Sequence, residues 1–222
     1  MGKNEPITFF VAIRNRTSIL VKHMGELKRV NLFNNNLKAL SELITDDDTF
    51  EMIIMDNKSN DVVMEEFVQQ YTKPNFTIRV INDDSVFFSK GALYNKAVQY
   101  ATHRLWFFLE ADMLIRGRTL FDDIETKVVK NKRVLFPICW SYSNPEHTIG
   151  DRHDTGVGNV IMFKEMFVPY LHNKKRGKED VYIFEHNKKI GHVARKYYGD
   201  EFIHQWHPRD TAFLNRYYEQ KK

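Results

Sequence analysis

Short runs of mostly apolar residues, rich in β-branched and aromatic side chains, recur through the first half of the chain. They cover residues 7–13, 52–55, 76–81 and 105–109. Apolar runs of this length, bounded by polar turn residues, predict strands that are buried on both faces of a sheet. We therefore expect a sheet whose strands lie inside the protein.

Apolar residues at three- and four-residue steps separate these runs and predict amphipathic helices. The predicted helices cover residues 17–43, 65–71 and 89–102. Strands that alternate with helices are joined by long crossovers, which place neighbouring strands parallel. The pattern therefore predicts an α/β fold with an open, mostly parallel sheet flanked by helices.

The pattern is less regular in the second half of the chain. Strands are predicted at 134–138 and 159–163, a polar loop at 141–156, and helices at 121–129 and 179–188. The sequence contains no internal repeat and no linker rich in Pro or Ser. We therefore predict a single domain.

Composition agrees with one domain and excludes some chemistry. The chain has 222 residues, of which 42% are hydrophobic, enough for one sizeable core. Its formal net charge of +4 would help a polyanionic partner approach but does not identify one. Cys139 is the only cysteine, which excludes an intrachain disulfide and a cysteine metal cluster. The apolar neighbours of Cys139 favour a buried thiol over a nucleophile.

No run in the sequence approaches the ~20 apolar residues of a membrane-spanning helix, and the first residues are polar. We therefore expect no membrane span and a cytoplasmic protein. Two kinds of protein fit this expectation: an intracellular enzyme of a bacterium or virus, and an enzyme trimmed of its membrane anchor.

Polar residues follow each predicted strand of the first half of the chain. Ligands of open α/β sheets bind at the carboxyl ends of the strands, where the strand order reverses. The residues in these positions are Arg14, Asn15, Arg16, Asp56, Asn57, Asp83, Asp84, Glu110 and Asp112. We expect them to form a charged rim along one edge of the sheet.

Glu110 and Asp112 are the most informative members of this rim. They are separated by one residue at the end of the most apolar predicted strand, so both point toward one cleft. Paired carboxylates suit Mg²⁺ or Mn²⁺, hard ions that keep positions open for the oxygens of a diphosphate. An acidic turn after a strand is also commonly only a solvated loop or a helix cap.

Two further candidate sites lie in the second half of the chain. Glu179 and Asp180 open a predicted helix, where carboxylates stabilise the helix dipole, but where one of them could also act as a general base. His204 and His207 are three residues apart, and a histidine from this segment could complete a metal site with Asp112. A histidine among aromatic residues is, however, more often a hydrogen-bonded core residue.

In their order along the chain, these segments resemble the motifs of GT-A glycosyltransferases of the family 2 type. The first predicted strand with Arg14, Asn15 and Arg16 resembles the opening motif of that family, whose polar residues bind the nucleotide. Residues 52–61 resemble the second motif, in which the first Asp contacts the nucleotide base and corresponds to Asp56.

The resemblance is strongest to the β-1,4-galactosyltransferase and chondroitin-synthase branches, through residues 88–98 and 105–113. It implies that Lys90 and Asn95 approach the diphosphate and sugar of the donor. It also implies that Asp112 is the principal metal ligand.

The later motifs have counterparts as well. Residues 177–181 resemble the Gly-Gly-Glu-Asp motif of these branches, which makes Asp180 the catalytic base and lets Glu179 contact the acceptor or donor sugar. Residues 204–208 resemble a late histidine motif that supplies a metal ligand, and His204 is the better match.

The sequence departs from the family pattern at three places. Glu110 replaces the first Asp of the metal motif, so its longer side chain is expected to contact ribose or a metal-bound water instead of the ion. Lys178 stands where these branches have Gly, and residues 140–158 match no branch.

The resemblance implies a single GT-A domain over residues 1–222, with a nucleotide-binding half (1–115) and an acceptor-binding half (116–222). The implied activity is Mn²⁺- or Mg²⁺-dependent transfer of a sugar from a nucleotide diphosphate donor, expected to be a UDP-sugar, to a hydroxyl acceptor. Inversion with Asp180 as base is expected, and a retaining course stays open because both classes share this fold and metal site.

Other readings of the sequence remain. A nucleotidyltransferase of similar architecture needs a Gly-rich phosphate loop after the first strand, where residues 14–17 contain no Gly. A noncatalytic carbohydrate- or nucleic-acid-binding module would not need Asp180 or a metal site. The acceptor could be a glycan, a protein or a hydroxylated base in DNA, the last suggested only by the net charge, the missing anchor and the basic residues 174–178.

Overall fold

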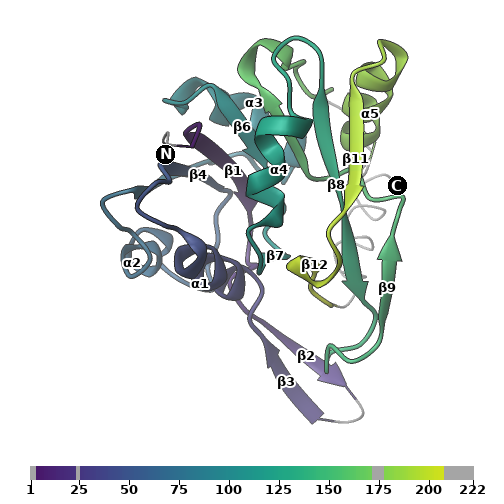
Figure 1. Cartoon of the computed structure of the whole chain (residues 1–222). Coiled ribbons are helices and arrows are strands. Elements are labelled where there is room, and N and C mark those ends of the chain that lie inside the picture. Colours follow the sequence, from purple (N-terminus) through teal and green to yellow (C-terminus); the bar gives the residue numbers. More distant parts are fainter. Residues whose placement is uncertain (1–3, 24–25, 172–177, 208–222) are drawn as a thin grey trace, which may run out of the picture.

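A ten-stranded mixed sheet forms the centre of the protein. The structure, a computed structural model, describes residues 4–23, 26–171 and 178–207. The main path through the sheet is β5-β4-β1-β6-β10-β8-β12-β7, and β9 and β11 also pair with β8. Helices lie on both faces of the sheet (Figure 1), as expected for the predicted α/β class.

The first half of the sheet is parallel. Its strands are β1 (Ile7–Ile13), β4 (Phe50–Asp56), β5 (Phe76–Asn82) and β6 (Leu105–Phe108). All residues of β1, β4 and β6 are buried, which explains the largely apolar sequence of these strands. The chain passes from β1 to β4 and β5 on one side and returns to β6 on the other, so the strand order reverses at β1.

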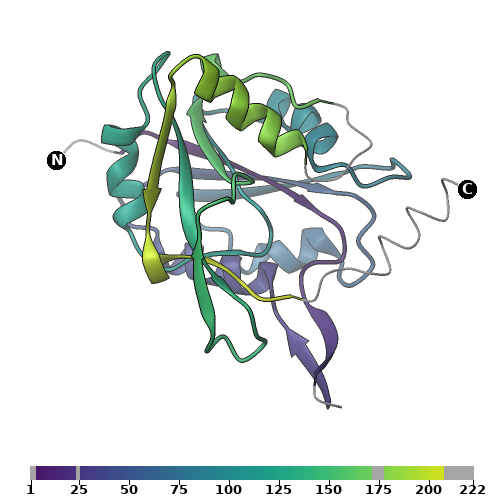
Figure 2. The same ribbon diagram turned by 90° about the vertical axis from the view of Figure 1, so that its right-hand side faces the viewer.

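Two groups of helices cover the sheet. On one face lie α1 (Phe33–Leu43), α2 (Met64–Gln69) and α4 (Thr119–Lys127), and on the other lie α3 (Lys90–Ala97) and α5 (Glu179–Lys189) (Figure 1, Figure 2). Short 3-10 helices occupy Val98–Tyr100, Lys164–Met166 and Gly199–Glu201. Among the described residues, no helix is both long enough and apolar enough to cross a membrane.

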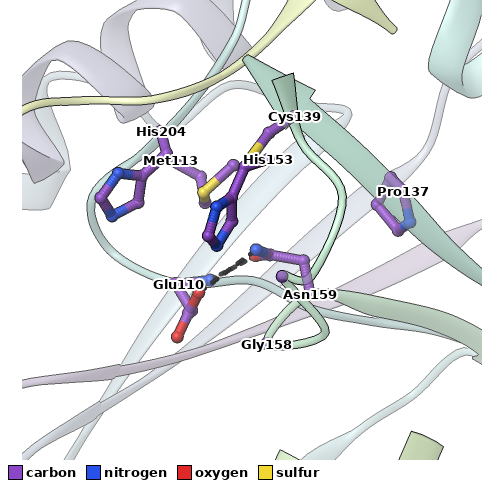
Figure 3. Close-up of a pocket in the computed structure, with 9 residues that line it drawn as sticks. Glu110, Met113, Pro137, Cys139, His153, Gly158, Asn159 and His204 are labelled. Atoms are coloured by element: carbon purple, nitrogen blue, oxygen red, sulfur yellow. Dashed lines mark hydrogen bonds between the residues drawn. The ribbon is translucent and has the colours of Figure 1, made fainter. Parts of the chain in front are cut away.

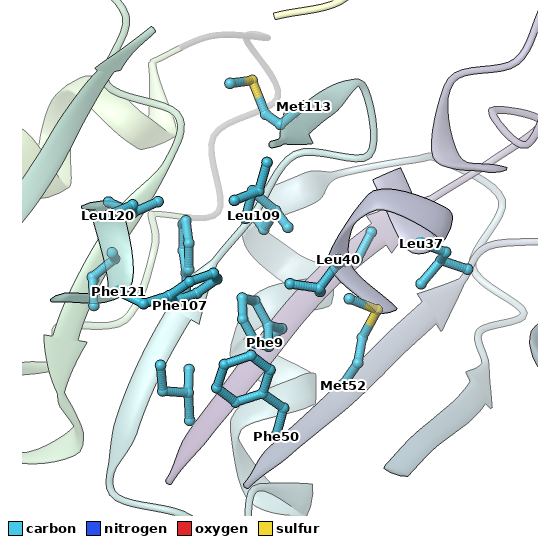
Figure 4. Close-up of a cluster of buried hydrophobic side chains, with 14 of the residues drawn as sticks. Phe9, Leu37, Leu40, Phe50, Met52, Phe107, Leu109, Met113, Leu120 and Phe121 are labelled. Atoms are coloured by element: carbon cyan, nitrogen blue, oxygen red, sulfur yellow. The ribbon is translucent and has the colours of Figure 1, made fainter. Parts of the chain in front are cut away.

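Alternate residues of β1 enter two separate hydrophobic clusters. Phe9 packs against Phe50 and Phe107 on one face, in each case with ring centroids 5.3 Å apart (Figure 4). Phe10 packs against Phe108 on the other face, with centroids 4.8 Å apart. These clusters hold the strands rigidly, so the polar residues that follow them start from fixed positions.

The second half of the sheet is centred on β8 (Val134–Tyr142). Its partners are β10 (Val160–Phe163) and β9 (Gly150–His153), both antiparallel, and β11 (Val193–Tyr197) and β12 (Phe202–His204), both parallel. β7 (Met113–Ile115) pairs antiparallel with β12, with His204 opposite Met113. This pairing brings the late histidine segment back to the carboxyl end of β6.

The predicted helix over residues 17–43 is wrong in its first part. A hairpin of β2 (Ile19–His23) and β3 (Glu26–Val30) occupies this part, and α1 begins only at Phe33. The hairpin projects beyond the main sheet (Figure 1, Figure 2), and Leu20 is 64% exposed. Its helical spacing of apolar residues therefore does not mark a buried face, and its β-branched residues suit a strand.

Smaller differences concern the second half of the chain. The predicted polar loop at 141–156 contains β9. The short strands β7, β11 and β12 were not predicted, because runs of three to five residues are too short to show a clear period.

Candidate active site

The loops after β1 and β4 are joined through Asn15. Its backbone N donates to Ser59 Oγ at 3.0 Å, and its side-chain Oδ1 accepts from Asn60 N at 2.7 Å. Asn15 has a φ of 52°, a conformation that Asn adopts more readily than most residues. Thr17 N also donates to Asp61 Oδ2 at 2.9 Å. These bonds fix the segment that contains the predicted nucleotide-binding residues.

Asp56 and Asn57 extend this polar surface. Asp56 is buried at the end of β4, and its Oδ1 accepts from Ser59 N at 3.0 Å. Asn57 donates from Nδ2 to Asp83 Oδ2 at 2.8 Å, after β5, and Arg14 Nη1 lies 3.4 Å from Asn57 Oδ1. The ends of three neighbouring strands thus form one connected rim, at the edge of the sheet that the sequence predicted.

Lys90 connects two carboxylates that are distant in the sequence. Its Nζ lies 2.6 Å from Glu110 Oε1, after β6, and 2.6 Å from Asp180 Oδ2, in the first turn of α5. Burial would lower the pKa of Lys90, but the charges of Asp180 and Glu110 raise it well above its ordinary value. Lys90 is therefore a permanent cation between two acids.

Burial raises the pKa of Asp180 to about 6, although the positive charge of Lys90 opposes this shift. Asp180 Oδ1 and Glu179 Oε2 are both buried without a hydrogen-bond partner in the described part of the chain, and so is the hydroxyl of Tyr170. Buried oxygens that lack a partner indicate a place where a ligand hydroxyl can bind. These three groups therefore mark a candidate ligand-binding surface at the start of α5.

Asn95, which the family resemblance places near the donor, is bound to the backbone of Tyr170. Its Nδ2 donates to Tyr170 O at 2.8 Å, and its Oδ1 accepts from Tyr170 N at 2.8 Å. Both polar ends of the side chain therefore hold the backbone of Tyr170 beside α3. Gly91 permits this packing, because a Cβ at that position would lie 2.8 Å from Tyr170 Cβ.

Glu110 borders a cavity of about 100 Å³, which His204 and Cys139 also line (Figure 3). Glu110 N donates to Asn159 Oδ1 at 2.9 Å, and Asn159 Nδ2 lies 3.3 Å from Glu110 Oε2. Gly158 lies so close that a Cβ there would be 2.5 Å from Glu110 Oε2. Asn159 and Gly158 therefore fix Glu110 from the side opposite Lys90, and nothing in the sequence pattern had indicated either residue.

Asp112 meets both histidines of the late segment. Asp112 Oδ2 lies 3.0 Å from His207 Nε2, and Asp112 Oδ1 lies 4.0 Å from His204 Nε2. One ligand atom from each residue falls within 4.8 Å of the others. The sequence had singled out His204, and the structure adds His207, for which the three-residue spacing was the available signal.

The chemistry of this group fits a divalent cation. Burial would raise the pKa of Asp112, but the hydrogen bond with His207 and the charges of His204, His207 and Arg16 lower it, so the carboxylate is ionised. Asp112 Oδ1 is buried and makes no hydrogen bond to any described residue. A carboxylate oxygen and two imidazole nitrogens together can hold an ion such as Mn²⁺.

Ser141 orients His204. Its Oγ lies 3.2 Å from His204 Nδ1, so the other ring nitrogen, Nε2, is the one that faces Asp112. In metal-binding histidines, a hydrogen bond to the ring nitrogen that does not bind the ion usually fixes the orientation of the ring. Ser141 is on β8 and was not among the predicted residues.

Two other predictions have clear outcomes. Cys139 is buried, as predicted, and burial raises the pKa of its thiol to about 12, which disfavours the reactive thiolate. The basic residues 174–177 and Pro208 lie outside the described residues, while Lys178 is exposed just before α5.

Two solved structures have the same fold. One is S. aureus TarS (1–349) in complex with UDP-GlcNAc, with a TM-score of 0.66, 12% identity and 92% of this chain covered. The other is the mannosyltransferase PcManGT from Pyrobaculum calidifontis in complex with GDP-Man and Mn²⁺, with a TM-score of 0.65, 14% identity and 96% covered. This chain spans only 59% of the first and 61% of the second.

Among curated proteins, none matches the sequence significantly. The family model described as glycosyl transferase family 2 matches residues 28–174, about two thirds of the chain. The matched part contains Asp56, Lys90, Glu110 and Asp112, and it ends just before α5. By this match, and with the GT-A fold of the structure, the chain belongs to glycosyl transferase family 2.

Proposed function

We propose that this protein is a metal-dependent glycosyltransferase that moves a sugar from a nucleotide diphosphate donor to a hydroxyl acceptor. The observation that carries the proposal is that Lys90 joins Glu110 to Asp180, while Asp112, two residues after Glu110, lies beside two histidines. One oxygen of Asp180 has no hydrogen-bond partner among the described residues. The Asp112 group could bind the leaving diphosphate through an ion, and Asp180 could accept the proton of the attacking hydroxyl.

At the donor end, Asp112, His204 and His207 would hold the ion, and two imidazoles beside one carboxylate favour Mn²⁺ over Mg²⁺. A bound ion of this kind neutralises the charge that develops on the departing diphosphate. Arg16 lies close enough to Asp112 to lower its pKa, so its cation would face the same diphosphate. The rim around Asp56 would bind the nucleoside.

At the acceptor end, Asp180 would act as the general base. Lys90 holds Oδ2, which leaves the buried Oδ1 for the acceptor hydroxyl. A pKa of about 6 lies close to neutral pH, where a base can both be deprotonated and bind a proton effectively. Attack from the side opposite the diphosphate inverts the anomeric carbon. Glu179, whose Oε2 makes no hydrogen bond to a described residue, would bind a sugar hydroxyl.

The sequence predicted a UDP-sugar as donor. TarS was solved with UDP-GlcNAc and PcManGT with GDP-Man, so both nucleotides belong in a test. For the acceptor, no described contact favours a glycan, a protein or a hydroxylated DNA base over the others. A cytoplasmic location also stays a proposal, as does the division of the single domain into nucleotide- and acceptor-binding halves.

The test is calorimetric titration with UDP- and GDP-sugars in the presence and absence of Mn²⁺. Wild-type protein is expected to bind one of these donors in a Mn²⁺-dependent manner, and Asp112→Asn is expected to lose that dependence. Asp151→Asn is the matched control, because Asp151 is an exposed carboxylate on β9. If the wild-type protein binds no nucleotide sugar with Mn²⁺, or if Asp112→Asn keeps the full metal effect, the proposal is wrong.

A further inference from the structure

Gln205, which lies between His204 and His207 in the sequence, is fully buried. Its side-chain Nε2 donates to Leu32 O at 2.9 Å and lies 3.4 Å from Asp112 O. Its Oε1 accepts from Asn35 Nδ2 at 2.9 Å, on α1. Its backbone N also donates to Asp112 O at 2.9 Å. One amide side chain thus links the late segment to the loop after β6 and to the start of α1.

The position of Gln205 matters because regular structure ends just before it. β12 stops at His204, and residues 205–207 belong to no helix or strand. His207 therefore lies beyond the sheet, where its ring contacts Asp112. Next to Gln205, Trp206 packs against Val30 and Leu32 at the base of the β2–β3 hairpin.

We propose that Gln205 is a positioning residue that holds His204 and His207 around Asp112 in the geometry that binds the metal. The inference rests on the proposed metal site and adds to it a residue that does not touch the ion. Its amide donates to the carbonyls of Leu32 and Asp112 and accepts from Asn35, so the three ligands keep their spacing before the ion arrives. Loss of such a supporting bond typically weakens metal affinity about 10–100-fold.

The test compares Mn²⁺ affinity with folding stability. Gln205→Met keeps a side chain of similar length but removes the donor and the acceptor. We expect its Kd for Mn²⁺ alone, from the free-ion electron paramagnetic resonance signal, to rise about 10–100-fold. Asn35→Leu removes only the hydrogen bond to Gln205 Oε1 and is expected to raise the Kd for Mn²⁺ by a smaller factor. This variant replaces Gln205→Met in the test if Gln205→Met does not fold.

Two controls separate positioning from general stability. Leu40→Ala opens the buried core of α1 and is expected to lower Tm without changing the Mn²⁺ Kd. Gln70→Met changes an exposed glutamine at the end of α2 and is expected to leave both unchanged. If Gln205→Met and Asn35→Leu both fold and both bind Mn²⁺ with a Kd within twofold of wild type, Gln205 is not a positioning residue. That outcome would leave the proposed metal site standing. A wild-type protein that does not bind Mn²⁺ would instead overturn the metal site, and this inference with it.

Discussion

Lys90 Nζ contacts Asp180 Oδ2 at 2.6 Å, while the second oxygen of the same carboxylate is buried and has no hydrogen-bond partner in the part of the chain that the structure describes. The contact joins the first residue of α3 to the first turn of α5. It fixes the orientation of Asp180, because rotation of the carboxylate would break the ion pair in a poorly solvated place. A general base needs this kind of fixed orientation, with one oxygen held and the other available.

Asp180→Asn should separate binding from transfer. The amide keeps the shape of the side chain but cannot accept a proton from a hydroxyl. We expect kcat to fall about 10²–10⁴-fold, with donor affinity in Mn²⁺ changed little. Donor binding is measured by calorimetry and transfer by product formation. Glu185→Gln, an exposed change on the same helix, is the control, and an Asp180→Asn protein with wild-type kcat would refute the base assignment.

The pH profile should report the ion pair between Lys90 and Asp180. Asp180 has a raised pKa of about 6, so kcat/KM should fall as the pH drops through about 6 and the base becomes protonated. The charge of Lys90 lowers that pKa, so Lys90→Met should move the acidic limb of the profile to higher pH. Lys188→Met, an exposed change on α5, should leave it in place. If the acidic limb of the pH profile lies at the same pH in Lys90→Met as in wild type, Lys90 does not set the pKa of the base.

Gly158→Ala should disturb Glu110 rather than the fold. A Cβ at residue 158 would lie 2.5 Å from Glu110 Oε2, so the flexible end of that side chain must move away. We expect reduced kcat with little change in Tm. Glu110→Asp shortens the side chain by one methylene and should restore part of the activity when combined with Gly158→Ala. If the double variant is no more active than Gly158→Ala alone, the clash is not the cause.

Stability at acid pH should depend on Asp48. Burial would raise its pKa, but Arg118 at 2.6 Å, Thr45 and Asn4 lower it to about 2. A depressed pKa means that the carboxylate stabilises the fold above its unfolded pKa of about 4, and that this contribution is lost as the pH falls through about 2. Asp48→Asn should cost about 2 kcal/mol at pH 7 in urea unfolding.

The difference between wild type and Asp48→Asn should therefore shrink between about pH 4 and pH 2. Asp46→Asn, which changes an exposed carboxylate two residues earlier, is the control and should have little effect at either pH. A difference that stays constant down to pH 2 would show that the charge of Asp48 is not the stabilising feature.

The sequence predicted the buried strands well, because a short and wholly apolar run such as that of β1 is stable mainly as a strand inside a sheet. It failed at β2 and β3, where apolar residues happen to recur at helical steps in a hairpin that projects from the sheet. Spacing along the chain does not reveal whether a face is covered. Whether a face is buried depends on helices and strands that come from other parts of the sequence.

The candidate site was predicted in part for the same reason. Residues directly after strands could be placed at one edge of the sheet from topology alone, as for Asp56 and Asp112. Lys90 and Asp180 are 90 residues apart, and their contact depends on how α3 and α5 pack. No local sequence pattern predicts this packing. Similarly, the two hydrogen bonds of Asn95 to Tyr170 can be seen only in three dimensions.

The pairing of β7 with β12 has a consequence for how the enzyme matures. Asp112 and Gln205 are 93 residues apart, so the carboxylate leaves the ribosome long before the histidines that surround it. At roughly 5–20 residues per second, the interval is on the order of 5–20 seconds. During translation the nascent sheet can form around β1, but the proposed cation site stays incomplete until β12 and His207 have been made and docked.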